Sequence, residues 1–172
     1  MIPLYTESVT LRALIKHMKE GEIPSYDPFG DDDAVALLDS LLLGIPIGLI
    51  VFGRLAENNQ TVVVDGRRRI ATIQAAFLSD DCPYHLSVLG MDPISYAGSA
   101  RSPDDVPFSA LFDPYALERW RCGPFGNQVQ YRAERIRAVP ISTAVMLEEG
   151  ENLEVARARI NRWTSLNRLS AR

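Results

Sequence analysis

The residues of this chain best suited to chemistry lie where a run of valines stops and a helical pattern begins. That stretch reads Val62-Val63-Val64-Asp65-Gly66-Arg67-Arg68-Arg69-Ile70. Glycine lets the backbone turn tightly or approach a ligand closely, and the unpaired N–H groups of a helix N-terminus favour negative charge. The pattern therefore predicts a strand–turn–helix that binds an anion, and the three arginines indicate a phosphate. An ordinary turn whose arginines face water is the alternative.

Composition limits the size of the domain that carries such a site and the kind of ligand that it binds. The chain has 172 residues, nearly half of them apolar, which suits one compact domain with a sizeable core. Its formal net charge of −4 argues against coating nucleic acid through bulk charge, but it leaves room for a local basic site. The arginine cluster is therefore expected to act locally.

Other kinds of site have little support in the sequence. Cys82 and Cys122 lie far apart without a Cys-x-x-Cys pattern, and no secretion signal opens the chain, so a reduced cytoplasm is expected. His17 and His85 are isolated in sequence, which argues against a transition-metal site, and the Walker A and Gly-x-Ser-x-Gly motifs are absent. Polar residues, glycines and a proline interrupt the apolar stretch 34–55, so it is not expected to span a membrane.

Hydrophobic periodicity predicts the elements that must position the arginines. We expect helices over residues 11–20, 34–43, 67–77, 114–121 and 152–167, and strands over residues 47–52, 61–64, 84–89 and 139–146. The two central strands should pair through a polar turn. Asp31, Asp32 and Asp33 are expected to cap the second helix, and Gly44 to end it.

Two loops complete the expected organisation. Prolines at positions 24 and 28 make residues 23–29 a rigid loop that presents Tyr26 and Asp27. Residues 90–109 are rich in glycine, proline, serine and aspartate, which is typical of a long loop or lid. The whole chain, residues 1–172, is thus expected to form a single α+β domain with a small mixed sheet flanked by helices.

The order of four segments resembles a known family. These are the opening helix, Ile-Pro-x-Tyr at residues 23–26, Leu-Leu-Asp-Ser-Leu-Leu-Leu-Gly-Ile-Pro-Ile-Gly at residues 37–48, and Val-Asp-Gly-Arg-Arg-Arg-Ile-Ala-Thr-Ile at residues 64–73. They are similar to the N-terminal domain of GmrSD-type modification-dependent restriction proteins, which has the ParB/sulfiredoxin-like fold and an Asp-Gly-Gln-Gln-Arg motif. The resemblance is carried by residues 23–77, about a third of the chain, and by Arg159-Ile160-Asn161 near its end.

The resemblance implies a nucleotide pocket at the arginine turn. The residues that it assigns to the phosphates or the nucleotide are Gly66, Arg67, Arg68, Arg69, Tyr26 and Asn161. Asp65, Gly66 and Arg69 match the family motif directly, whereas Arg67 and Arg68 replace its two glutamines. These replacements keep hydrogen-bond donors and add two positive charges.

The resemblance also implies hydrolysis of a nucleoside triphosphate with Mg²⁺ in a DNA restriction or phage-defence system, with DNA or a nuclease chain as partner. Asp65 or Asp27 would hold Mg²⁺ or orient water, while Arg69 and its neighbours offset charge on the transferred phosphoryl group. A simple N-cap or turn former is the other role open to Asp65.

One departure from the family keeps other functions open. Family members carry Gln-Arg where this chain has Asp27-Pro28, so an amide and a guanidinium are missing from the loop expected to face the nucleotide. The alternatives are a non-catalytic scaffold of the same fold that binds DNA or a protein, and a small-molecule phosphotransferase.

Overall fold

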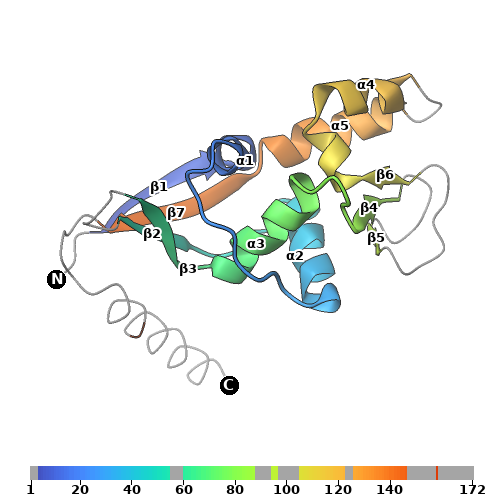
Figure 1. Ribbon diagram of the computed structural model, residues 1–172. Helices are drawn as coiled ribbons and strands as arrows, with labels where there is room; N and C mark the ends of the chain where they lie inside the picture. The colour runs from blue at the N-terminus through green and yellow to red at the C-terminus, as the bar shows by residue number, and fades with distance from the viewer. Residues whose placement is uncertain are drawn as a thin grey trace.

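The computed structural model describes residues 4–54, 60–87, 94–96, 105–122, 126–146 and 158. Its elements are β1 (Leu4–Thr10), α1 (Leu11–Lys19), α2 (Asp31–Leu43), β2 (Ile50–Arg54), β3 (Thr61–Asp65), α3 (Arg67–Phe77), β4 (Tyr84–Leu86), β5 (Ile94–Tyr96), β6 (Val106–Pro107), the 3₁₀ helix η1 (Phe108–Leu111), α4 (Pro114–Arg121), α5 (Gly126–Arg137) and β7 (Pro140–Met146). Figure 1 shows the larger sheet at one end of the molecule, and α4, α5 and the smaller sheet at the other.

A mixed four-stranded sheet in the order β1-β7-β2-β3 forms the first of these ends. β1 runs antiparallel to β7, β7 runs parallel to β2, and β2 runs antiparallel to β3. The α+β class, the mixed sheet and the pairing of β2 with β3 are therefore confirmed. The edge strand β3 ends at Asp65, directly before the arginine turn.

The first and third helices bury their apolar stripes in one core with this sheet. Members of that core that are almost fully buried include Leu11, Leu14, Ile50, Ile70, Ile73 and Ile141. The helical members repeat at intervals of three, which is the spacing that places residues on one face of a helix. Burial of this stripe anchors α3 and so holds its N-terminus at the end of β3.

The ends of the first two helices follow the predicted signals, with one correction. Thr10 caps α1, because its Oγ1 accepts a hydrogen bond of 3.2 Å from Ala13 N. Gly44 ends α2 in the left-handed conformation, as predicted. The N-cap of α2 is Gly30, however, and the three aspartates at 31–33 occupy its first turn, where the helix dipole favours negative charge.

Several elements differ from the sequence-based expectation. β1 and α5 were not predicted, and the expected loop at residues 90–109 contains β5 and β6, which pair with β4 in a second sheet of order β5-β4-β6. These strands are two or three residues long, too short to show a periodic pattern. The expected helix over 152–167 lies outside the described residues, apart from residue 158.

The proline-containing loop before α2 lies along β3 and α3. The Tyr26 hydroxyl accepts a hydrogen bond of 3.0 Å from Val63 N, and Phe29 N donates to the buried Thr72 Oγ1 at 3.1 Å. Two bonds therefore tie this loop to the strand and the helix on either side of the arginine turn. Among the residues described, no helix has the length and apolar content needed to cross a membrane.

Replacing Tyr26 by phenylalanine should lower the free energy of unfolding by about 1 kcal/mol, because the N–H of the buried Val63 loses its acceptor. Urea denaturation followed by circular dichroism measures this loss. Tyr131→Phe is the matched control, since Tyr131 is 62% exposed on α5, and it should leave stability unchanged. Equal stability of the Tyr26 variant and the wild type would contradict the proposed contribution of this hydrogen bond.

Candidate functional site

The strand–turn–helix predicted at the arginines is present. β3 ends at Asp65, Gly66 follows with a φ of +90°, and α3 begins at Arg67. A left-handed conformation of this kind favours glycine, because a side chain there costs about 1–2 kcal/mol. The N-cap position belongs to Gly66, so the alternative role of Asp65 as an N-cap is wrong. Within the described residues, no side-chain hydrogen bond caps α3 at Gly66.

Arg69 connects three segments of the chain at this turn. Its Nη1 donates a hydrogen bond of 2.9 Å to the Ile47 carbonyl, which precedes β2. Its Nη2 lies 3.3 Å from Asp65 Oδ2, with the two side chains 19% and 31% exposed. Arg69 therefore stabilises the turn from within, and its remaining N–H groups are the ones left for a ligand.

Two glycines make room for the Arg69 guanidinium. A Cβ on Gly48 would lie 2.8 Å from Arg69 Nη1, and a Cβ on Gly66 would lie 3.3 Å from Arg69 Nη2. Both glycines have positive φ, +85° and +90°. The backbone thus approaches the guanidinium from two sides. At Gly48 a Cβ would displace the guanidinium, and at Gly66 it would make a tight contact with it.

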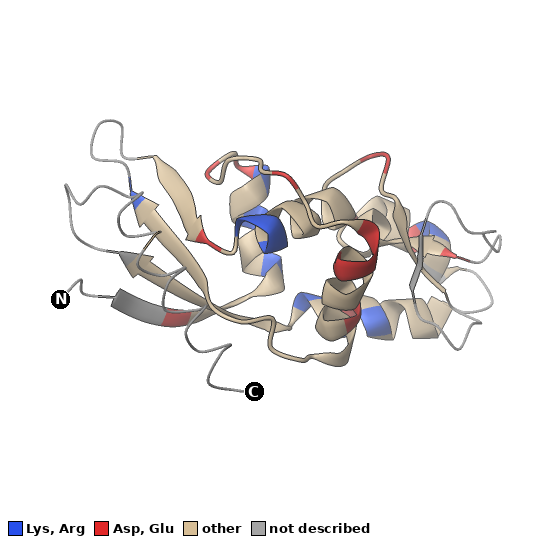
Figure 2. Ribbon diagram, turned by 90° about the horizontal axis from the view of Figure 1, so that it is seen from below, with Lys and Arg blue, Asp and Glu red and all other residues tan. Residues whose placement is uncertain are grey.

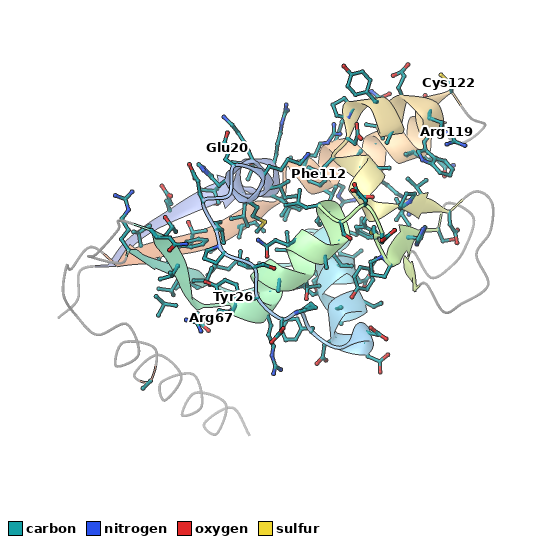
Figure 3. All side chains as sticks on the ribbon, viewed as in Figure 1. Glu20, Tyr26, Arg67, Phe112, Arg119 and Cys122 are labelled. Carbon is teal, nitrogen blue, oxygen red and sulfur yellow. The ribbon has the colours of Figure 1, made fainter. Side chains whose placement is uncertain are left out.

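Arg67 and Tyr26 together cover one residue of the edge strand. Arg67 Nε donates to the Val63 carbonyl at 2.7 Å, and Val63 N donates to the Tyr26 hydroxyl at 3.0 Å. The Arg67 guanidinium also lies 5.2 Å from the centre of the Tyr26 ring, within range of a cation–π contact, and Figure 3 shows the two side chains together at the start of α3. The backbone N–H and the backbone carbonyl of Val63, which point away from β2, therefore both have hydrogen-bond partners.

Arg68 is the arginine left for solvent or a ligand. Its side chain is exposed, and no described residue forms an ion pair or hydrogen bond with it. Figure 2 shows a continuous basic segment at the start of α3, with an acidic segment at the start of α2. An uncapped helix N-terminus with an unpaired guanidinium beside it is a suitable geometry for an anion.

The structure brings together most of the residues singled out in the sequence. Tyr26, Asp65, Gly66, Arg67 and Arg69 share direct contacts or adjacent positions around the turn. Asp27 follows Tyr26 in the chain and is exposed, so its expected role stays a prediction. Asn161 lies outside the described residues.

Gly48 and the Ile47 carbonyl are the parts of the site that sequence reasoning missed. They come from a segment 19 and more residues before the arginine turn, and a backbone carbonyl has no signal in a residue pattern. The Gly-Ile-Pro-Ile-Gly run at 44–48 was the available clue, because two glycines that close together indicate unusual backbone conformations.

A second group of polar side chains lies at the end of α1. His17 is not isolated in space: its Nδ1 lies 2.6 Å from Glu22 Oε2, and Glu20 stands nearby, 3.7 Å from Lys16 Nζ. All of these side chains are exposed or nearly half exposed. Lys16 and Glu20 form a surface ion pair and His17 and Glu22 a surface hydrogen bond, and exposed pairs of this kind contribute little to stability.

Comparison with known protein families found no family model that matches this chain, and comparison with curated proteins found no significant match. The function of this chain is therefore inferred from the geometry of the site and the chemistry of its residues.

Substitution of Gly48 by alanine should lower the free energy of unfolding by about 2–4 kcal/mol, through backbone strain and displacement of the Arg69 guanidinium from its acceptors. Gly21→Ala is the matched control, because Gly21 has a φ of +74° but open space around a Cβ, and it should cost only about 1–2 kcal/mol. Chemical denaturation of both variants gives the comparison.

A double-mutant cycle isolates the contact itself. In an Arg69→Ala background, Gly48→Ala should cost no more than Gly21→Ala, because the guanidinium that it would displace is gone. An unchanged cost in that background would show that Gly48 does not act through Arg69.

Proposed function

We propose that this chain binds a nucleoside triphosphate, with the phosphates at the turn from Asp65 to Arg69. The observation that carries the proposal is the exposed, unpaired Arg68 guanidinium beside the uncapped N-terminus of α3. Backbone N–H groups and a guanidinium together supply both the hydrogen bonds and the charge that phosphate oxygens require. A turn held by Arg69 and two glycines presents these donors in one fixed arrangement.

In this proposal each of the three arginines has a different role. Arg68 contacts the phosphates directly, because it has no described partner within the chain. Arg67 gives one N–H to the Val63 carbonyl and keeps the rest of its guanidinium for the ligand. Arg69 holds the turn through Ile47 and Asp65, so its loss would affect the fold as well as the affinity.

Asp65 fits the expected Mg²⁺ in its donor chemistry. Mg²⁺ in nucleotide sites is held by one or two carboxylates together with substrate phosphates. Asp65 is partly exposed and bonds Arg69 through Oδ2, which leaves Oδ1 for such a role. The ion would neutralise charge between phosphates, and the arginines would stabilise the transferred phosphoryl group.

The wider context follows from the resemblance to GmrSD-type domains of the ParB/sulfiredoxin-like superfamily. We propose membership of that superfamily, hydrolysis of the nucleotide, and a role in DNA restriction or phage defence with DNA or a nuclease chain as partner. The supporting observations are the α+β architecture, the order of the four resembling segments and the Asp-Gly turn between β3 and α3.

A non-catalytic scaffold is the second candidate, and one observation favours it. Leu43, Ile45 and Leu49 are 54%, 49% and 39% exposed, and they lie in the segment that runs from the last residue of α2 to the first residue of β2. Exposed apolar side chains close to one another are typical of protein-binding surfaces. In this candidate function the arginine turn is structural and the neighbouring apolar segment binds a partner protein.

Changing Arg68 to glutamine should weaken nucleotide binding by about 10–100-fold and leave stability unchanged, because one charge-assisted contact to phosphate is lost. Isothermal titration with each of the four ribonucleoside triphosphates in the presence of Mg²⁺ measures the affinity. Arg119→Gln, an exposed arginine on α4, makes the same change of charge at a distance and should bind like the wild type.

The titration also decides between the candidates. Saturable binding that is weakened in the Arg68 variant but not in the Arg119 variant supports the nucleotide pocket. Failure of the folded wild-type chain to bind any of the four nucleotides favours the scaffold and contradicts the proposal.

If binding is found, release of inorganic phosphate should depend on Mg²⁺ and be abolished in Asp65→Asn, because the carboxylate proposed to hold the ion becomes neutral. Asp80→Asn, an exposed aspartate after α3, should retain full turnover. Binding without turnover in the wild type would indicate a non-catalytic domain. Transfer of phosphate to a small molecule instead of water would indicate a phosphotransferase.

A further inference from the structure

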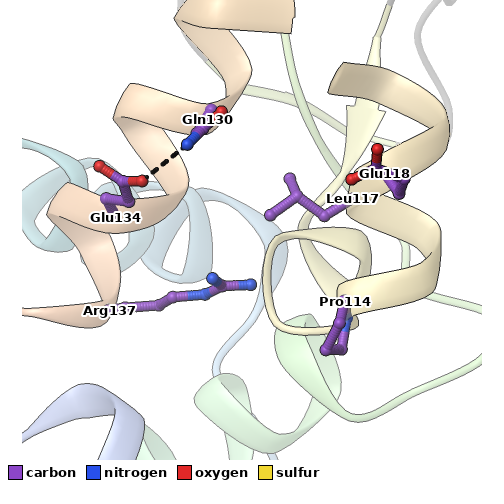
Figure 4. Close-up of a pocket in the computed structure, with 6 residues that line it drawn as sticks. All are labelled: Pro114, Leu117, Glu118, Gln130, Glu134 and Arg137. Carbon is purple, nitrogen blue, oxygen red and sulfur yellow. Dashed lines mark hydrogen bonds between the residues drawn. The ribbon is translucent and has the colours of Figure 1, made fainter. Parts of the chain in front are cut away.

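A cavity lies between α4 and α5, at the opposite end of the molecule from the main sheet. Its volume is about 230 Å³, and its walls are Pro114, Leu117 and Glu118 of α4 and Gln130, Glu134 and Arg137 of α5 (Figure 4). Pockets for drug-sized molecules occupy about 300–1,000 Å³. The cavity is therefore too small for a nucleotide, and its ligand would be a smaller molecule than the one proposed for the arginine turn.

Arg137 is the basic residue among those that line this cavity. It is half-buried, and no described carboxylate forms an ion pair with it. Burial lowers the pKa of its guanidinium, the positive charge of Arg12 lowers it further, and Glu134 acts in the opposite direction. The Arg137 guanidinium thus lies within the electrostatic influence of a second cation, Arg12, and of the Glu134 carboxylate.

The position of Arg137 is fixed by an aromatic contact. Its guanidinium lies 5.6 Å from the centre of the Phe112 ring, and that ring packs edge-on against Phe77 at 4.8 Å between centroids. Figure 4 shows the side chain reaching from α5 across the cavity toward Pro114. A guanidinium held in this way presents its N–H groups to the cavity with little loss of conformational freedom on binding.

Acidic and apolar groups line the rest of the cavity. Glu134 accepts a hydrogen bond of 2.9 Å from Gln130 on one carboxylate oxygen, which leaves its other oxygen available. Glu118 stands on the facing helix, and the buried Leu117 and the ring of Pro114 supply an apolar surface between the charged groups. Positive charge, negative charge and a small apolar surface therefore occur within one cavity.

We propose that this cavity binds a small zwitterion of the amino-acid class. The carboxylate of the ligand pairs with the Arg137 guanidinium, and its ammonium group pairs with the carboxylate oxygen of Glu134 that Gln130 does not bond. A short aliphatic side chain packs on Leu117 and Pro114. A simple anion would be repelled by the two glutamates and a simple cation by the arginine, so only a ligand with both charges satisfies the whole lining.

L-leucine is the probe for this site, titrated into the 172-residue chain and followed by the amide and Leu117 methyl signals in NMR spectra. We expect saturable shifts confined to α4 and α5. Isocaproate, which lacks the ammonium group, and isoamylamine, which lacks the carboxylate, should each bind at least tenfold more weakly. Equal binding of either analogue would overturn the zwitterion assignment, and the absence of saturable shifts would overturn the site.

Variants of Arg137 and of Glu134 test the positive and the negative group of the cavity separately. Arg137→Gln and Glu134→Gln should each weaken L-leucine binding at least tenfold, and the exposed position of Glu134 makes its variant the safer one for folding. Arg135→Gln is the matched control, because Arg135 is exposed on the same turn and does not line the cavity. Wild-type affinity in the Glu134 variant, or equal losses in the control, would contradict the proposal.

Discussion

The contact between the Arg69 guanidinium and the backbone on two sides of it is the constraint on which the candidate site depends. One side chain bonds a carbonyl before β2 and a carboxylate at the end of β3, and its residue lies in the first turn of α3. Gly48 and Gly66 allow this approach only because neither has a Cβ. The relative position of two strands and a helix is thereby linked to one charged group that is four-fifths shielded from solvent.

This constraint explains why three adjacent arginines can have different roles. Successive residues of a helix project about 100° apart, so neighbours in the chain meet different surroundings. Arg69 turns inward to the two glycines, Arg67 lies over Tyr26 at the sheet edge, and Arg68 faces outward. One short motif can therefore both hold the turn and bind a ligand, because different side chains of the motif serve the two roles.

The covering of Val63 has a further consequence for the sheet. An edge strand with free N–H and C=O groups invites pairing with another chain. Tyr26 and Arg67 satisfy both outward groups of Val63 and contact each other, so the middle of β3 is closed to such pairing. The loop that carries Tyr26 thus protects the sheet edge and borders the arginine turn at the same time.

Local sequence determined the elements with clear periodicity or end signals: α1 with its Thr10 cap, α2 with its Gly44 end, and the passage from β3 through Gly66 into α3. These elements depend on contacts between residues a few positions apart, so the local sequence pattern predicts them. Tertiary structure alone decided the short sheet β5-β4-β6, the place of Gly48 against Arg69, and the cavity at Arg137. Each of these features joins segments that are distant in the chain, through backbone groups or through packing. The energy of such contacts depends on the folded geometry. They therefore leave no local pattern in the sequence.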